Sequence, residues 1–356
     1  MPSSFIQTFL RSKVVWLYAA SGGVVLGTIL LGLLTSSVTI PVPTLVHIIM
    51  EEAFNLGWME DVPENEKMII WNIRLPRVLL ALCVGASLAL AGAAFQGLLR
   101  NPLADPYTIG VSSGASLGAV FVLFFNVSIV GLGDFTLPVV AIISGMITLL
   151  IVFGLVHLSS RGLAIETIIL AGIIVSAFIG SIISLIIALS DQDSMTQIIY
   201  WLYGSVGMRG WSYVQLMLPF MAVGVFLLLL HYRELNALAL GEDAADHIGV
   251  HVKRGKISIL AGASLLTGAA VAVSGSIGFV GLVIPHLVRL VTGPDHRHVL
   301  PLSLLTGGAF LVLADLVARN IIAPQELPIG VITALIGAPI FAFLLVRERL
   351  GRRNPA

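Results

Sequence analysis

Long apolar segments, separated by short polar connections, follow one another along almost the whole chain. An α-helix needs about 20 apolar residues to cross a bilayer. Ten segments fit this pattern: 14–36, 75–97, 108–130, 136–158, 164–189, 211–232, 257–274, 278–293, 299–319 and 327–346. The eighth segment is the shortest and contains Pro285. The pattern predicts an all-α polytopic membrane protein with a single transmembrane domain over residues 1–356.

Basic residues at the two ends of the chain set the expected number of crossings. Residues 1–13 contain Arg11 and Lys13, and residues 347–356 contain four arginines. Because Lys and Arg are enriched on the cytoplasmic side of membranes, both termini are expected in the cytoplasm. This requires an even number of spans, which ten satisfies and nine does not. The first apolar run is too long for a cleaved signal peptide and is predicted to be a retained span.

The connecting loops agree with this orientation. Fourteen of the nineteen Lys and Arg residues fall on the cytoplasmic side: Arg11, Lys13, Arg100, Arg161, Arg233, Lys253, Arg254, Lys256, Arg289, Arg297, Arg347, Arg349, Arg352 and Arg353. The outer loop, residues 37–73, is instead acidic: Glu51, Glu52, Glu60, Asp61, Glu64 and Glu66. The positive-inside rule therefore orients every span without conflict.

Composition narrows the class of protein. The chain is 57% hydrophobic and 11% charged, and its mean hydropathy is +1.02. A formal net charge of zero argues against a nucleic-acid partner, which needs a basic surface. Cys83 is the single cysteine, so neither a disulfide framework nor a cysteine metal site is expected.

The longest polar interruption of the C-terminal two thirds is the predicted cytoplasmic loop 233–256. The pattern predicts one short helix before Gly241 and a second that begins with Glu242 and Asp243 and ends near Gly249. Such a compact helix pair suits docking into a groove on a soluble partner. A solvated connector is the alternative interpretation of the same residues.

Candidate catalytic chemistry is sparse. Gly255 and Lys256 resemble part of a phosphate-binding loop, but Ile257 occupies the Ser/Thr position. His296 and His298 have no partnering carboxylate pair, so no metal site is predicted. A carrier driven by an ion gradient usually needs more buried carboxylates than this chain offers, which disfavours that class but leaves it open.

Glycine spacing indicates how the spans pack. Gly110, Gly114 and Gly118 recur at every fourth residue, which allows another helix backbone to approach closely. Residues 190–210 are predicted to be an outer connection with a short interfacial helix, in which Trp201 and Tyr203 lie at headgroup depth.

Six sequence motifs occur in order along most of the chain. They are IRLPRVLLALCVGASLALAGAAFQGLLRNPLADPYTIGVSSGASLGA at 73–119, YWLYGSVG at 200–207, LNALALGEDAADHIGV at 235–250, SGSIGFVGLVIPHLVRL at 274–290, LADLVAR at 313–319 and ELPIGVITALIGAPIFAFLL at 326–345. In this order they resemble the FecCD-type permease subunits of ABC importers for ferric siderophores, haem and cobalamin.

The resemblance implies an assembly of several subunits in a prokaryotic cell membrane. A second permease, identical or paralogous, would complete the pathway, two soluble ATPase subunits would bind ATP and Mg²⁺, and a substrate-binding protein would dock outside. This chain would bind no cofactor itself and would not be an enzyme. The ATPase-coupling residues would be Leu235, Leu238, Gly241, Glu242, Ala245 and Gly249.

The resemblance also implies two further sites. Arg74 and Arg319 would face acidic residues of the binding protein. A headgroup anchor is the alternative for Arg74, and an intrahelical pair with Asp315 suits Arg319 equally well. A cytoplasmic gate would be formed by Asn101, Pro102 and Leu103, for which a plain tight turn is the alternative interpretation.

The function expected from these observations is passage of a bulky metal chelate through a permease that a partner's ATP hydrolysis drives. The pathway is expected to be wide, with few polar side chains. An ion-gradient-coupled secondary transporter and a membrane-embedded enzyme are the alternatives. Uptake that survives ATP depletion would favour the carrier, and copurification with a soluble ATPase would favour the permease.

Overall fold

The computed structural model describes residues 3–35, 40–54, 62–159 and 164–353, and these residues form helices joined by short connections. The first half contains α1 (Ser3–Leu34), α2 (Val42–Phe54), α3 (Glu64–Met68), the π-helical η1 (Ile69–Arg74), α4 (Leu75–Leu98), η2 (Pro106–Ile109), α5 (Val111–Phe125), η3 (Gly133–Phe135), α6 (Thr136–Leu158) and α7 (Ile165–Leu189). The second half contains α8 (Gln192–Leu202), α9 (Gly210–Leu230), α10 (Tyr232–Ala239), α11 (Glu242–His247), α12 (Val252–Ser274), α13 (Val280–Thr292), α14 (His296–Asn320) and α15 (Ile329–Arg353).

The ten predicted spans all coincide with helices. Among the described residues, seven helical runs are long and apolar enough to cross a membrane: Val14–Leu34, Glu64–Leu98, Gly133–Leu158, Ile165–Leu189, Gly210–Leu230, Val252–Ser274 and His296–Asn320. Three shorter apolar helices, α5, α13 and the apolar part of α15, occupy the remaining predicted positions. The fold is therefore the predicted all-helical, multi-pass membrane bundle.

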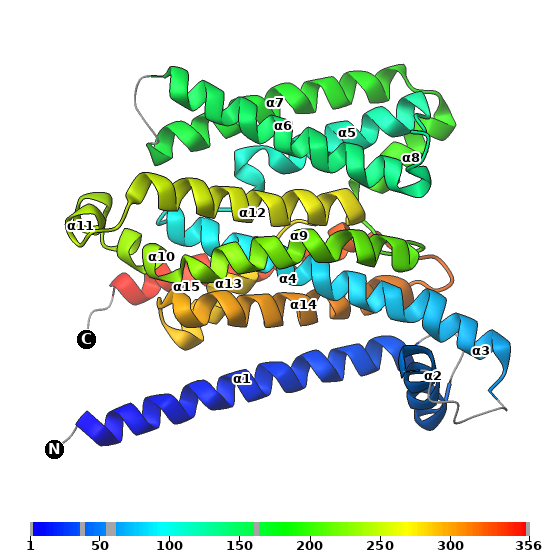
Figure 1. The fold of residues 1–356 in the computed structure, drawn as a ribbon, viewed down its shortest axis with the longest axis horizontal. Coiled ribbons are helices and arrows are strands. Elements are labelled where there is room, and N and C mark those ends of the chain that lie inside the picture. The colour runs from blue at the N-terminus through cyan, green and yellow to red at the C-terminus, as the bar shows by residue number, and fades with distance from the viewer. Residues whose placement is uncertain (1–2, 36–39, 55–61, 160–163, 354–356) are drawn as a thin grey trace.

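Both ends of the described chain and the α10–α11 pair lie at one end of the bundle, whereas α2, α3 and α8 lie at the other (Figure 1). This arrangement agrees with an even number of crossings. By the charge distribution of the loops, the end with α10 and α11 is the cytoplasmic one. Arg161, one of the predicted cytoplasmic residues, lies outside the described residues, as do Glu60 and Asp61 of the outer loop.

Two spans show the extremes of packing. In the run that contains α4, 89% of the most apolar window is buried inside the protein, whereas for α1 the figure is 6%. Helix α4 is thus the centre of the bundle, and α1 lies along its edge with most of its surface turned to lipid (Figure 1). The small residues of α4 permit this: Gly85 contacts the backbone of Gly307 in α14, and Gly92 contacts the backbone of Gly281 in α13.

The glycine stripe of the third span also packs as predicted. Gly114 lies against the side chain of Thr148 in α6, and Gly118 lies against Ser144 in the same helix. A methyl group at either position would overlap these neighbours. Gly110 precedes the helix with a φ of +91°, a backbone conformation that favours glycine.

Helices α5 and α13 are shorter than their predicted spans, because part of each crossing is not helical. Such backbone is tolerated at membrane depth only where protein covers it. Here the segment before α5 pairs with the segment before α13. The Tyr107 hydroxyl donates a hydrogen bond to the Ile277 carbonyl and accepts one from the Ile277 amide, both at 3.0 Å.

Two expectations need correction. The second span does not begin at residue 75, because α3, η1 and α4 form one helical run from Glu64, so the predicted outer loop 37–73 contains the start of this helix and all of α2. The side chain of Trp201 is not presented to the membrane interface: it is 6% exposed and packs against buried residues of α5 and α12. Tyr203, in contrast, is exposed.

Candidate functional site: the inner cavity and the adjoining helix pair

The polar interruption at 233–256 folds into the predicted pair of short helices, α10 and α11. Gly241 joins them with a φ of +117°, and Gly249 ends the pair with a φ of +86°. Both values lie in the region that favours glycine. Glu242 begins α11 and forms an ion pair with Lys256 of α12, with 2.5 Å between the Oε2 and Nζ atoms. This ion pair holds the protruding pair of helices against the span that follows.

The apolar residues of the pair do not all face outward. Leu235, Leu238 and Ala245, three of the predicted coupling residues, are at most 2% exposed and pack among the inner ends of the spans. Leu240 and Ile248 are instead 73% and 64% exposed. In this conformation α10 packs Leu235 and Leu238 against the bundle, and the coupling role of the predicted residues stays a prediction. The large apolar side chains that are exposed on the pair are Leu240 and Ile248.

Asn236 connects α10 to the start of α14. Its amide nitrogen donates to Asp295 Oδ1 at 2.7 Å, and its amide oxygen accepts from the backbone nitrogen of His296 at 2.9 Å. Asp295 also caps α14 by accepting from the Arg297 amide at 2.9 Å. Burial opposes ionisation of Asp295, but the hydrogen bonds from Arg297 and Asn236 outweigh it and lower the pKa of this carboxyl group. The helix pair is thus hydrogen-bonded to a spanning helix.

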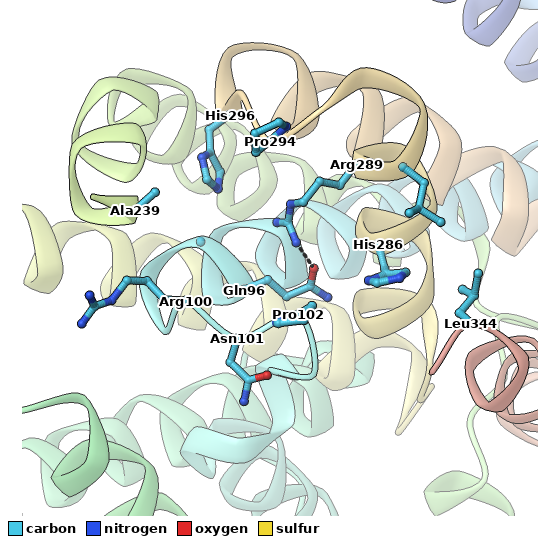
Figure 2. A pocket seen from close by; sticks show the side chains of 12 residues that line it. Gln96, Arg100, Asn101, Pro102, Ala239, His286, Arg289, Pro294, His296 and Leu344 are labelled. Carbon is cyan, nitrogen blue, oxygen red and sulfur yellow. Dashed lines mark hydrogen bonds between the residues drawn. The ribbon is translucent and has the colours of Figure 1, made fainter. Parts of the chain in front are cut away.

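A cavity of about 740 Å³ opens at the inner ends of α4, α13 and α15, beside α10 (Figure 2). It is lined by Gln96, Gly97, Arg100, Asn101, Pro102, Ala239, His286, Arg289, Leu290, Pro294, His296 and Leu344. Two of the three predicted gate residues, Asn101 and Pro102, belong to this lining. Leu103 is 44% exposed and lies outside it. The Leu103 amide donates to Asn101 Oδ1 at 2.9 Å, which closes the turn after α4.

The polar side chains of the cavity come from helices far apart in the sequence. Arg289 Nη1 donates to Gln96 Oε1 at 3.1 Å, and Gln96 Nε2 donates to the Leu282 carbonyl at 3.0 Å (Figure 2). His296 packs over Gly97, where no side chain intervenes. The cavity therefore carries more polar and basic groups than the predicted smooth pathway. Gln96 and Asn236 lie within the motifs at 73–119 and 235–250, but the sequence did not single out either residue.

The outer arginines differ from the prediction in their placement. Arg74 is 3% exposed and its Nη1 donates to the Leu33 carbonyl at 2.8 Å. The Arg319 side chain is 8% exposed, and its Nη2 donates to the Gly32 carbonyl at 2.6 Å. Both guanidinium groups cap the last turn of α1, where unpaired carbonyl groups favour a cation. In this conformation neither is presented at the outer surface, and their docking role stays a prediction.

The principal partner of Asp315 is Arg77, the second arginine of the RLPR motif, and not Arg319. Arg77 Nη2 lies 2.9 Å from Asp315 Oδ1, whereas Arg319 Nε lies 3.9 Å from Asp315 Oδ2. Arg77 Nη1 also reaches Glu326 Oε1 at 2.8 Å. The hydrogen bond from Arg77 lowers the pKa of Glu326 below its ordinary value of 4.5. Arg77 thus joins α4, α14 and the connection before α15.

These features define the class of the protein: a multi-pass helical membrane protein with a basic cavity at its inner end and a helix pair projecting beside it. The family model described as the FecCD transport family matches residues 24–347, and the chain belongs to this family. It is a multi-pass protein of the cytoplasmic membrane and a permease of the ABC importer class.

Named relatives and a solved structure agree with this assignment. The ABC transporter permease protein YvrB of Bacillus subtilis is 50% identical over 99% of this chain and 100% of its own length. The cobalamin import system permease protein BtuC of Halobacterium salinarum is 45% identical over 81% of this chain and 76% of its own length. A structure of a metal-chelate type ABC transporter in an inward-facing conformation aligns with a TM-score of 0.81 at 33% identity, covering 93% of this chain and 98% of the other.

Proposed function

We propose that this chain forms the membrane pathway of a binding-protein-dependent importer for bulky metal chelates, driven by ATP hydrolysis in a separate partner subunit. The observation that carries the proposal is the α10–α11 pair. It projects from the inner end, exposes Leu240 and Ile248, and is hydrogen-bonded through Asn236 to α14. Membership of the permease family and the inward-facing, metal-chelate type structure that the chain resembles support it.

The proposed mechanism transmits motion from the partner into the spans. A groove on the ATPase subunit holds Leu240 and Ile248, and Gly241 sets the angle between α10 and α11. When the partner closes around ATP, α10 moves with the groove. Because Asn236 binds both Asp295 and the His296 amide, this movement reaches the start of α14 and the wall of the inner cavity. The cavity then opens to one side of the membrane at a time.

On the outer side, a substrate-binding protein delivers the chelate, and a second permease copy or a paralogue completes the pathway. The acidic side chains before the second span, including Glu51 and Glu52, lie on this side and pair with Lys67. Arg74 and Arg319 reach the binding protein only if they release the carbonyl groups at the end of α1.

Substitutions in the helix pair test the proposal. Leu240→Asp places a charge in the proposed groove, and Gly241→Pro is incompatible with a φ of +117°, so each is expected to abolish ATP-driven uptake while membrane insertion is retained. Copurification of the partner ATPase measures docking, and chelate uptake into proteoliposomes measures transport. Glu242→Arg, which repels Lys256, is expected to reduce transport in the same way.

Gly131→Pro is the matched control for Gly241→Pro. Gly131 also has a positive φ, of +90°, but it lies in the connection between α5 and α6 at the outer end. Uptake by Gly131→Pro is expected to persist. Normal uptake by both Leu240→Asp and Gly241→Pro would overturn the docking role, and uptake that continues after ATP depletion but stops when an ion gradient is collapsed would identify a secondary carrier instead.

A further inference from the structure

The inner cavity has an unbalanced charge. Its lining contains two arginines, Arg100 and Arg289, and none of the twelve lining residues is an aspartate or a glutamate. Within the described part of the chain, neither arginine forms an ion pair. Asp295, a carboxylate next to the lining but not part of it, accepts hydrogen bonds at Oδ1 from Asn236 and from the Arg297 amide.

Of the two arginines that line the cavity, Arg289 is the more buried and lacks a counter-charge among the described residues. It is half-buried, and its one hydrogen bond joins Nη1 to the neutral Gln96 Oε1. Its Nη2 is buried and makes no hydrogen bond to a described residue. Removing a charged group from water without a counter-charge is costly, so a bound anion would stabilise this arrangement. The planar guanidinium matches the geometry of carboxylate and phosphate oxygens.

The shape of the cavity indicates what kind of anion it would hold. A volume of about 740 Å³ is within the range of small-molecule sites, ~300–1,000 Å³. Pro102, Leu290 and Leu344 add apolar surface to the same lining. A ligand with an organic body and an anionic edge fits both surfaces. A side chain of the ATPase would instead meet the exposed Leu240 and Ile248, which are not part of this lining.

We infer that the inner cavity is a transient exit site for an anionic metal chelate, whose carboxylate or other oxyanion groups bind Arg289. This inference rests on the proposed transport function and adds the charge of the cargo. One strong cationic contact orients the chelate as it leaves the membrane without holding it, because transport requires a site weak enough to release its ligand. Arg100, exposed at the rim of the cavity, extends the positive potential to the inner mouth.

Direct binding of citrate to the purified permease–ATPase complex tests the inference. The complex is placed in phosphatidylcholine nanodiscs, and the thermal unfolding midpoint is followed while citrate replaces chloride at constant ionic strength. The unfolding midpoint of wild type is expected to rise with citrate concentration and to saturate. Arg289→Gln is expected to weaken the citrate affinity about tenfold or more, because one charge-assisted hydrogen bond is lost. Triethyl citrate, which has a similar shape but no charge, is expected to give no rise.

Arg297→Gln is the matched control. Arg297 is an exposed arginine close to the same mouth but outside the cavity lining, so its substitution is expected to leave citrate binding unchanged. Equal citrate affinity in wild type and Arg289→Gln, or no citrate effect in wild type, would overturn the inference. If the Arg289→Gln permease no longer copurified with the ATPase, Arg289 would be a contact to the partner subunit. If phosphatidylglycerol copurified with wild type but not with Arg289→Gln, Arg289 would bind a lipid headgroup. Either result would also overturn the inference. The proposed transport function is judged separately, by the copurification and uptake of the Leu240→Asp variant.

Discussion

At the outer end of the bundle, Arg77 contacts two carboxylates, whereas at the inner end Arg289 contacts one neutral amide. Both side chains are largely withdrawn from water. The outer arginine joins three parts of the chain and is satisfied within it, as expected for a structural contact. The inner arginine borders a cavity and is only partly satisfied. The two ends therefore differ in how the cation is satisfied: the counter-charges of Arg77 lie in the chain itself, whereas the cavity-lining Arg289 has one hydrogen bond to a neutral amide among the described residues.

The largest loss of stability is expected from removing the ion pair between Arg77 and Asp315 at the outer end. Arg77→Met leaves the carboxylate of Asp315, which is 1% exposed, without its principal partner. Removing one member of a buried ion pair typically costs about 3–5 kcal/mol. Thermal unfolding of the purified protein in nanodiscs should therefore show a strongly lowered midpoint.

The double variant Arg77→Met with Asp315→Leu is the control for the outer pair. Because it removes both charges, it is expected to recover much of the lost stability. If the single and the double variant were equally unstable, the defect would come from packing around residue 77 rather than from an uncompensated charge.

A much smaller effect on stability is expected from Arg289→Met at the inner end. This change removes one hydrogen bond to Gln96 but also removes a poorly compensated cation, and these two contributions oppose each other. The unfolding free energy in ligand-free buffer should change by less than about 1 kcal/mol. A loss as large as that of Arg77→Met would show that Arg289 has a structural partner and would remove the contrast between the two ends.

The smallest expected effect on stability is the pH dependence that comes from ionisation of Glu326. Its folded-state pKa is lowered below the ordinary value of 4.5, so its contribution to stability is fully present above that pH and is lost as the pH falls through the lower value. The carboxylate is half exposed, so solvent screening limits the contribution to less than about 1 kcal/mol. Unfolding midpoints measured at pH 6 and pH 3.5 should fall slightly more for wild type than for Glu326→Gln. An identical fall in both would show that Arg77 does not stabilise the ionised Glu326.

Much of the fold was predictable because the bilayer imposes simple rules. Each span must be apolar over about 20 residues, and basic loops remain in the cytoplasm, so the number and direction of the crossings follow from local composition. The α10–α11 pair was predictable for a related reason. Gly241 and Gly249 interrupt a polar segment at positions where only glycine readily adopts the required φ.

Residue partners were harder to predict. The sequence suggested that Asp315 pairs with Arg319, because residues four apart lie on the same helix face. In the folded chain, Arg77, 238 positions away, forms the shorter contact, and Arg319 instead caps α1. The coupling residues Leu235 and Leu238 were assigned to a docking surface, but α10 packs this face against the bundle. In each case a neighbouring helix provided a partner that helix periodicity alone does not reveal.

By itself, the pattern of the sequence determined a ten-span helical membrane protein with both ends in the cytoplasm and a helix pair beside them, and the resemblance of its ordered motifs indicated the permease family. Hydrophobic length, loop charge and glycine positions are local properties that act on short segments. Only the tertiary structure decided which cations are neutralised. That outcome depends on contacts between helices far apart in the sequence: Arg77 and Asp315 are 238 positions apart, and Gln96 and Arg289 are 193 positions apart. The inner cavity, and the anion site inferred in it, form where α4 and α13 pack together.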